Sequence, residues 1–276
     1  AEAVSVVEQP PLDGTKVAMW LYLQSGASVH SLGGNLCEVQ RGAYRHLWSG
    51  TNCNTLATSE EQTRALLTDY AARLRHNGCT LADNCIRTWF FVQNVDVNYR
   101  GLVKARNEVF ATEGLTRDTH YIASTGIGGR GRSPQVFVTM DTYAISGLQK
   151  GQLGYLYART NLNPTYEYGV SFERGATVDY ADRRHVFISG TASINNRGEV
   201  VHVGDIRQQT QRMWDNVQAL LAEAGCGWDD VEHMIVYLRD VSDYAVVRRM
   251  FDERFPHTPR VITYARVCRP TWLVEM

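Results

Sequence analysis

The sequence predicts an α+β protein built from two tandem copies of one module, each a mixed β-sheet with two helices packed on one face. Paired motifs recur at a single spacing: Gln62-Thr63 and Gln209-Thr210 lie 147 residues apart (209 − 62), and Gly78-Cys79 and Gly225-Cys226 lie the same 147 apart (225 − 78). Each copy also runs strand, helix, strand, helix and two further strands. That order is typical of one sheet with its helices on one side.

The first strand of each copy ends at a Ser-Gly-Thr triplet, at 49–51 and at 189–191. The segment after each triplet carries apolar residues at i, i+3 and i+4 spacing, which indicates one buried helix face. A glycine then stands where a left-handed residue would end the helix. The two faces and their glycines are Leu66, Leu67, Tyr70, Leu74 and Gly78, and Trp214, Val217, Leu220, Leu221, Ala224 and Gly225.

A β-rich run follows each helix, CIRTWFFV and VEHMIVYL, and a second helix is predicted at 98–110 and at 243–255. The closing strands are YIAST with QVFVTMDTYAI, and VITYARV with TWLVEM. We divide the chain into an N-terminal module at 1–148, whose first 16 residues form a loose arm, a polar linker at 149–164 and a C-terminal module at 165–276. The helix-free face of each sheet must be covered by the other module or by another chain.

Composition narrows the function classes. The 276 residues are 44% apolar with a formal net charge of −1, so the basic excess of a nucleic-acid binder is missing. No apolar run is long enough to span a bilayer. Six cysteines without a CxxC pair indicate the reduced thiols of a cytoplasmic protein. The histidines show no metal-ligand spacing, so we expect no metal, no cofactor, and neither nucleic acid nor membrane as a partner.

The second copy resembles the Rid/YjgF family, formerly labelled endoribonuclease L-PSP or translation initiation inhibitor. The matching features are the triplet at 189–191, GDIRQQT, AGCGWDDV, YLRDVSDY and the closing residues Arg260 and Glu275. The likeness covers the second half and extends more weakly over 49–145. It implies a chorismate-mutase-like fold and, since single modules of the family form trimers with pockets between subunits, either a trimer-like homo-oligomer or a pseudo-symmetric monomer.

The fusion of two such modules, with STGIGG in the first half and CRPTWLVEM at the end, resembles the chorismatases. These two-module members of the superfamily release pyruvate from chorismate. Glu275, with the small residue Cys268 seven positions before it, matches their glutamate. The resemblance therefore implies a small unsaturated carboxylate as the substrate.

Arg260 and Glu275 are the leading candidates for chemistry. A guanidinium presents a planar fork of donors that suits a carboxylate, and the resemblance assigns that role to Arg260. A carboxyl at the end of an apolar strand has a raised pKa and exchanges protons near neutrality, so Glu275 is the candidate catalytic residue. The alternatives are a surface arginine and an outward-facing glutamate. Our hypothesis requires the two side chains to share one hollow and fails if they point to opposite faces of the sheet.

Further arginines are candidate anion contacts. Arg248 stands where many Rid proteins have asparagine, a residue that the first copy keeps as Asn107. A second arginine beside Arg260 suits a substrate with two carboxylates, although Arg248 reads equally well as a solvated helix position. Phe172 and Arg174 occupy the strand that lines the pocket in the family, so we predict that both contact the substrate.

The remaining predicted contacts are small residues. The backbone N–H groups of Ser189, Gly190 and Thr191 could bind a carboxylate or an oxyanion, or the triplet is only a turn. Cys268 is predicted to line the pocket rather than to act as a nucleophile, because no histidine adjoins it to depress its pKa.

The first copy lacks the arginine–glutamate pair. Thr119 falls at the place of Arg260, and Met140 and Asp141 stand near the place of Glu275. We therefore expect the first module to complete the second pocket or the assembly. STGIGGRGR (124–132) fits no nucleotide-binding motif and is predicted to be a flexible loop that reaches over the neighbouring pocket.

Three function classes remain. The first is acid-catalysed hydrolysis of an enol ether, as in the chorismatases. Within the same superfamily, the alternative reaction is deamination of an enamine or imine with release of ammonia. A non-catalytic ligand-binding or regulatory protein is the second class, because a fold alone does not prove activity. The third, a ribonuclease, is disfavoured by the weak charge and the missing aromatic-basic face.

Overall fold

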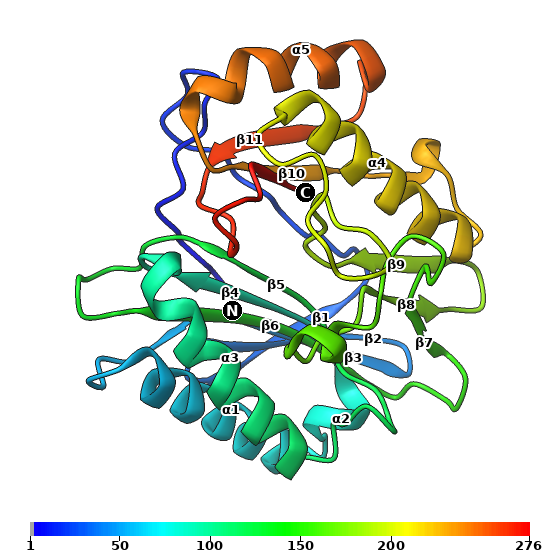
Figure 1. Cartoon of the computed structure of the whole chain (residues 1–276). Coiled ribbons are helices and arrows are strands. Elements are labelled where there is room, and N and C mark those ends of the chain that lie inside the picture. Colours follow the sequence, from blue (N-terminus) through cyan, green and yellow to red (C-terminus); the bar gives the residue numbers. More distant parts are fainter. Residues whose placement is uncertain (1–2) are drawn as a thin grey trace.

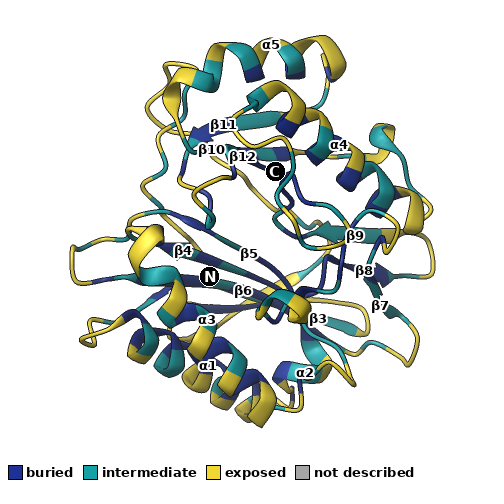
Figure 2. Cartoon of the chain, in the orientation of Figure 1, coloured by how far each residue is buried: buried dark blue, intermediate teal, exposed yellow. Residues whose placement is uncertain are grey.

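The computed structural model describes residues 3–276, which fold into two halves with their sheets turned toward each other (Figure 1). Helices α1 and α3 lie on the outer side of the first sheet, and α4 and α5 lie on the outer side of the second. Buried residues gather on the sheets and on the helix faces turned toward them (Figure 2). Within these residues, no helix is both long and apolar enough to cross a bilayer.

The first half is a six-stranded mixed sheet in the order β1-β2-β3-β6-β4-β5. Only the pair β4 and β5 is parallel. Its elements are β1 (Ser28–Gly33), β2 (Leu36–Arg41), β3 (Tyr44–Cys53), α1 (Ser59–His76), α2 (Leu81–Asn84), β4 (Cys85–Val92), α3 (Val95–Thr112), β5 (Ala123–Gly128) and β6 (Val138–Ser146).

The second half repeats this plan with shorter strands. Its elements are β7 (Leu153–Leu156), η1 (Thr165–Tyr168), β8 (Gly175–Asp179), β9 (Arg184–Ile188), α4 (Ile206–Glu223), η2 (Trp228–Asp230), β10 (Met234–Leu238), η3 (Val241–Asp243), α5 (Tyr244–Arg254), β11 (Arg260–Tyr264) and β12 (Val274–Glu275). The ladders are β7-β8-β9 and β11-β10-β12. A bridge from Ala192 to Glu275 joins them, so the strand order equals that of the first half and the predicted duplication is confirmed.

Two predictions about connecting segments need correction. The segment 149–164, expected as a linker, contains β7, which pairs antiparallel with β8 and is an edge strand of the second sheet. The N-terminal arm is not loose over its described part. Glu8 forms a bridge with Arg130 of the first half, and Leu12 N–H donates to Ile262 O of β11 at 3.0 Å. The arm therefore ties the two halves together, because it bonds to both.

The paired motifs that revealed the repeat have the same structural role in each half. Gly78 and Gly225 both follow the long helix with φ of 73°, the left-handed conformation that glycine adopts without strain. The glutamines are fully buried. Gln62 hydrogen-bonds the backbone at Leu56 and across 135–138, and Gln209 does so at His202 and across 271–273. Each glutamine thus fixes the segment that leads into the last strand of its half, β6 or β12, which lies inside the sheet.

The inner faces of the sheets pack on each other. One buried cluster joins Ile86 and Tyr143 of the first sheet to Ala176 and Val178 of β8. Edge strand β5 is also extended by second-half backbone, since Gly128 N–H donates to Arg266 O at 2.8 Å. The cover that the sequence required is therefore supplied by the other module.

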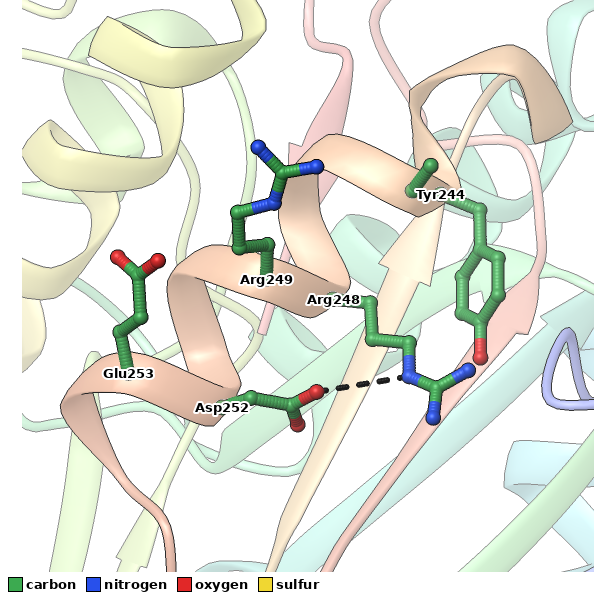
Figure 3. A pocket seen from close by; sticks show the side chains of 6 residues that line it. Tyr244, Arg248, Arg249, Asp252 and Glu253 are labelled. Carbon is green, nitrogen blue, oxygen red and sulfur yellow. Dashed lines mark ion pairs between the residues drawn. The ribbon is translucent and has the colours of Figure 1, made fainter.

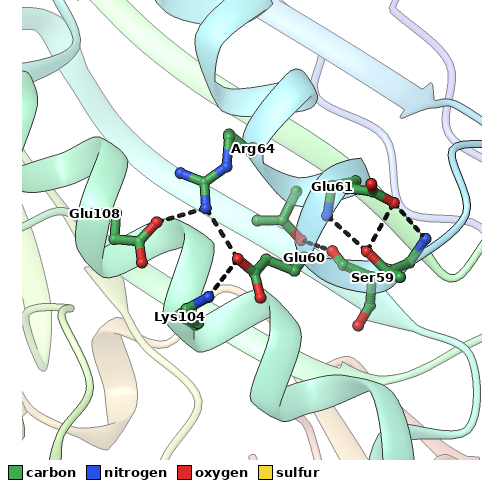
Figure 4. A network of polar contacts seen from close by, with 8 residues as sticks. Ser59, Glu60, Glu61, Arg64, Lys104 and Glu108 are labelled. Atoms are coloured by element: carbon green, nitrogen blue, oxygen red, sulfur yellow. Dashed lines mark hydrogen bonds and ion pairs between the residues drawn. The ribbon is translucent and has the colours of Figure 1, made fainter.

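On the outer side, charged residues fix α3 against α1. Lys104 pairs with Glu60 at 2.7 Å, and Arg64 bridges Glu60 and Glu108 (Figure 4). These pairs are largely exposed and screened by water, so each contributes little to stability. A Cβ at Gly101 would overlap Ser59 Oγ, so glycine permits the close approach of the helices.

Candidate functional site

A cavity of about 550 Å³ lies between the two halves. The first half supplies one wall, made of Tyr99, Arg100, Val103, Lys104, Arg106 and Asn107 of α3 and Ser124, Thr125 and Gly126 of β5. The second half supplies the other wall, made of Tyr168, Gly169, Val170, Phe172, Arg174, Gly190, Ala192, Ile194, Cys268, Arg269, Trp272 and Glu275. Neither module encloses the cavity alone.

Glu275 is the buried acid of this cavity. It pairs with Tyr237 in the sheet and is 4% exposed. Burial removes water from the carboxylate and raises the pKa of Glu275 to about 8, although the positive charges of Arg87 and Arg174 lower it. The carboxyl is therefore largely protonated at neutral pH and can donate a proton.

Gly190 makes room for that carboxyl. A Cβ at this position would overlap Glu275 Oε1 and would lie 3.0 Å from its Cδ. Its N–H donates to Thr125 Oγ1 at 3.0 Å. The glycine of the Ser-Gly-Thr triplet is thus required by the acid beside it.

Two buried arginines lie close to the ring of Phe172. The Cζ of Arg174 lies 5.4 Å, and that of Arg106 5.8 Å, from the centre of the Phe172 ring. Arg174 is held by Asn163, whose carbonyl accepts from Nη2 at 2.9 Å. Within residues 3–276, Nε and Nη2 of Arg106 and Nε of Arg174 are buried without a hydrogen-bond partner. Unpaired buried donors cost about 1–3 kcal/mol each, so the two guanidiniums are candidate anion contacts of the cavity that they line.

The rest of the wall combines a third arginine with aromatic and other neutral side chains. Arg269 stacks between Tyr168 and Trp272, with its Cζ 4.7 and 4.8 Å from the two ring centres. Burial raises the pKa of Cys268 to about 12, so it lines the cavity as a protonated thiol and not as a nucleophile. Burial also raises the pKa of Tyr99 well above its ordinary value, which keeps its phenol protonated.

A loop of the second half is clamped to the first across the cavity. Asn107 Nδ2 donates to Gly169 O at 2.9 Å, and Ser171 Oγ donates to Asn107 Oδ1 at 2.6 Å. The loop carries Phe172 and leads to Arg174. Asn107, the residue that the first copy shares with many Rid proteins, therefore holds the segment that carries Phe172 and Arg174 in place.

The expected pairing of Arg260 with Glu275 is wrong, and strand register explains why. Arg260 of β11 pairs with Met234 of β10, whereas Glu275 of β12 pairs with Tyr237 on the other side of β10. At about 4.8 Å between strands and about 3.3 Å per residue, their Cα atoms are about 14 Å apart. Met234 and Tyr237 are an odd number of residues apart, so the two side chains point to opposite faces of the sheet.

Arg260 has a structural role instead. It donates to Phe255 O at 2.6 Å, at the carboxyl end of α5, and pairs with Asp252. Arg248 also pairs with Asp252, at 3.5 Å, on a shallow surface pocket of α5 (Figure 3). Cations near a helix carboxyl end are favourable. The substrate contacts predicted for Arg260 and Arg248 are therefore corrected, because neither residue lines the cavity.

The triplet does not offer its backbone donors to a ligand. Ser189 N–H donates to Arg174 O at 3.0 Å, Thr191 N–H donates to Met276 O at 2.9 Å, and Gly190 N–H is bonded to Thr125. Ser189 and Thr191 are buried outside the cavity wall. Their predicted role as oxyanion donors is therefore corrected to strand pairing.

The N-terminal arm packs on the counterpart region of the first half. Asp141 on β6, the counterpart of β12, accepts Thr51 N–H at 2.7 Å, and burial raises its pKa to about 6. The arm covers it, because a Cβ at Gly50 would lie 2.8 Å from Val4 O. The segment expected as a flexible loop begins as strand β5. Its Ser124–Gly126 line the cavity, whereas Arg130 pairs with Glu8 at 3.3 Å.

Sequence reasoning missed the contribution of α3 to the site. Arg106 falls between Leu102 and Phe110, four residues from each, on the buried face of the helix. An arginine on an apolar stripe is out of pattern, and this signal was available in the sequence. Tyr99 and Thr125 carried no comparable signal, since their place depends on how the modules face each other.

Comparisons with known proteins agree with this architecture. The family model described as endoribonuclease L-PSP matches residues 176–276. A RutC family protein of Pyrococcus abyssi is 39% identical over 71 residues, which are 25% of this chain and 55% of that protein. The 3-aminoacrylate deaminase RutC of Acinetobacter baylyi is 30% identical over 93 residues, which are 33% of this chain and 74% of that protein.

Among solved structures, a chorismatase matches 89% of this chain and 77% of its own length with a TM-score of 0.73 and 23% identity. The match covers both halves of the chain and their relative placement, and at this identity it shows a shared fold. The chain therefore belongs to the Rid/YjgF superfamily, whose family model is described as endoribonuclease L-PSP, in a tandem form with the chorismatase fold.

Proposed function

We propose that the chain hydrolyses the enol ether of an unsaturated dicarboxylate, in the manner of a chorismatase acting on chorismate, and releases pyruvate. One observation carries the proposal: a buried carboxyl with a pKa of about 8 shares a cavity between the two halves with two buried arginines that have donors without partners. The likeness to a chorismatase, which is a likeness of fold, supports the same reaction class.

The arginines fit a substrate with two carboxylates. The guanidiniums of Arg174 and Arg106 both lie near the Phe172 ring and line the cavity, so each is placed to bind one carboxylate of the substrate. Charge-assisted bonds of this kind contribute about 1.5–3 kcal/mol each. Arg269 adds a third positive charge nearby.

The chemistry follows from the protonation state of Glu275. Its carboxyl donates a proton to the terminal methylene carbon of the enol ether, and the ether oxygen stabilises the cation that forms. Water adds to this cation and gives a proton to the Glu275 carboxylate, which restores the acid. The resulting hemiketal breaks its carbon–oxygen bond, the hemiketal hydroxyl proton passes to the departing oxygen, and the products are pyruvate and an alcohol. One water is consumed in total.

The test is pyruvate release from chorismate by the purified chain. Glu275→Gln keeps the shape but cannot act as an acid, so we expect kcat to fall by about 10²–10⁴-fold. Arg174→Ala is expected to raise KM about tenfold or more, whereas Arg248→Ala, on the α5 surface, leaves both constants unchanged. Absence of pyruvate with the folded wild-type chain rejects the proposal.

Enamine deamination is the second candidate, because the 30% identical relative is a 3-aminoacrylate deaminase. In that case Glu275 would activate water for attack on an imine carbon, and ammonia would leave. Ammonia from 3-aminoacrylate or 2-aminoacrylate, without pyruvate from chorismate, would favour this candidate. A protein that binds chorismate equally well with and without Glu275→Gln, and turns over none of these compounds, would be a binding module.

A further inference from the structure

We propose that Arg87, in strand β4 of the first half, is a positioning residue whose hydrogen bonds and charge hold Glu275 from behind the cavity wall. The inference deepens the proposed function, since it takes the same acid as its object. Arg87 does not line the cavity and belongs to the first module, whereas Glu275 belongs to the second. It therefore gives the first half a direct part in the chemistry of the second.

Arg87 is an unusual residue for its place. It is 4% exposed in the apolar strand CIRTWFFV, where a guanidinium loses its hydration at considerable cost. Its acceptors are all neutral: Nη1 donates to Thr88 O at 3.3 Å, and Nη2 donates to Thr125 Oγ1 and to Ile188 O at 3.3 Å. Its Cζ lies 4.9 Å from the centre of the Trp89 ring. Within residues 3–276, no carboxylate hydrogen-bonds to this buried cation, and Glu275 is the carboxyl group with which its charge interacts.

A chain of contacts leads from Arg87 to the acid. Thr125 Oγ1 accepts both from Arg87 Nη2 and from Gly190 N–H, the latter at 3.0 Å. Gly190 in turn lies against the carboxyl of Glu275, because a Cβ there would be 3.0 Å from Cδ. Arg87 also donates to Ile188, two residues before Gly190. It thus fixes both the strand end and the threonine on which the position of Glu275 depends.

Several groups face Glu275 from the elements packed around it. Arg87 from β4 and Arg174 from before β8 carry positive charge, and both lower its pKa. Tyr99, Tyr237 and Cys268 are neutral, because burial raises the pKa of each. Burial lowers the pKa of Arg87 to about 10, so it remains a cation at neutral pH.

The two arginines differ in what a substrate does to them. Arg174 lies in the cavity wall, where a bound carboxylate would neutralise its charge. Arg87 is screened from the cavity by Thr125, so its charge stays with Glu275 throughout a turnover. When Glu275 has given up its proton, Arg87 stabilises the carboxylate. Its loss should therefore slow the proton donation and, at the same time, let Glu275 keep its proton to higher pH.

The test follows the protonated carboxyl of Glu275 by infrared spectroscopy, with the band identified by its absence in Glu275→Gln. In the wild-type chain we expect the band to be lost with a midpoint at about pH 8. In Arg87→Gln the midpoint should rise by about one pH unit, the scale of one nearby opposite charge. The matched control is Arg73→Gln, a half-buried arginine of the first half that donates to Asn52 Oδ1 at 2.7 Å, and its midpoint should equal that of the wild type.

An Arg87→Gln midpoint equal to the wild-type value, in a folded protein, overturns the inference. Should that variant fail to fold, Arg87→Lys replaces it, because it keeps a cation but cannot reach Thr125 and Ile188 together. Its midpoint should stay at the wild-type value while kcat falls about tenfold through the displaced acid; unchanged kcat overturns the positioning role. The infrared midpoint requires no turnover. A shifted midpoint without pyruvate release would therefore reject the proposed function and leave this inference standing.

Discussion

Gln209 offers a sharp test of how the fold positions the acid. Its Nε2 donates to Thr271 O at 2.9 Å, and its Oε1 accepts Leu273 N–H at 2.9 Å. These bonds flank Trp272, which lines the cavity, and end two residues before Glu275. Gln209→Leu keeps the volume of the side chain and removes both hydrogen bonds to this segment. The segment that leads into β12 is then no longer held in a fixed position on α4.

The magnitude follows from the groups left without partners. Each buried group that loses its hydrogen bond costs about 1–3 kcal/mol. The Thr271 carbonyl lies at an exposed residue and regains water, whereas the Leu273 N–H is only partly accessible. We therefore expect Gln209→Leu to lower the free energy of unfolding by about 2–4 kcal/mol. We also expect a fall of about 10²-fold in kcat, the effect of displacing a catalytic group by about 1 Å.

The first half supplies a matched control. Gln62 is equally buried and holds the backbone of residues 135–138 in the same way, with its Oε1 accepting Phe137 N–H at 2.7 Å. None of these residues lines the cavity. Gln62→Leu should cost a similar free energy of unfolding, measured in urea, with kcat for pyruvate release unchanged at an equal folded fraction. Equal losses of kcat in the two variants would refute the reasoning.

Three further predictions concern the buried carboxyls. Gly190→Ala should lower kcat by about 10²-fold, because the new Cβ displaces Glu275; Gly227→Ala, where a Cβ meets nothing within 4 Å and φ is −131°, is the control with unchanged kcat. With an acid of pKa about 8, kcat/KM should be flat at lower pH and fall about tenfold per unit above it; a profile that rises there would contradict an acid role. The pKa of the Asp141 carboxyl is raised to about 6 in the folded protein. The folded state is therefore favoured at a pH below the pKa of this carboxyl in the unfolded chain, and that advantage is lost as the pH rises through 6. Asp141→Asn should therefore raise the free energy of unfolding at pH 7 by up to about 3 kcal/mol and leave it unchanged near pH 3, as urea titrations at the two pH values would show.

Periodic and local features of the sequence were sufficient to predict the fold class and the duplication. The apolar stripes of α1 and α4 and the glycines that end them depend only on local spacing, and they predicted both helices. The duplication then required that the strands repeat their order. The shortness of the second-half strands and the place of β7 inside the expected linker lay beyond such reasoning, since edge strands form through pairing that no local pattern specifies.

Part of the site was predictable from the family pattern. Phe172, Arg174, Cys268 and Glu275 lie where the family pattern places its pocket, and the structure brings them to one cavity. Arg260 was misplaced because the face of a strand-end residue depends on register across three strands, which sequence spacing does not determine. A loop separates β11 from β12, so the number of residues between Arg260 and Glu275 does not tell whether their side chains lie on the same face of the sheet.

The division of labour between the modules follows from these placements. Glu275 comes from the second half, whereas Arg106, Thr125 and Arg87 come from the first. Two identical modules related by symmetry would each have to keep a full set of these residues. Fusion removes that constraint, because each half now meets the other in a fixed and unequal way. The first half can therefore cover its own counterpart region with the N-terminal arm and still be required for the site. Without the first half, Glu275 would face open water and its pKa would return toward the ordinary range.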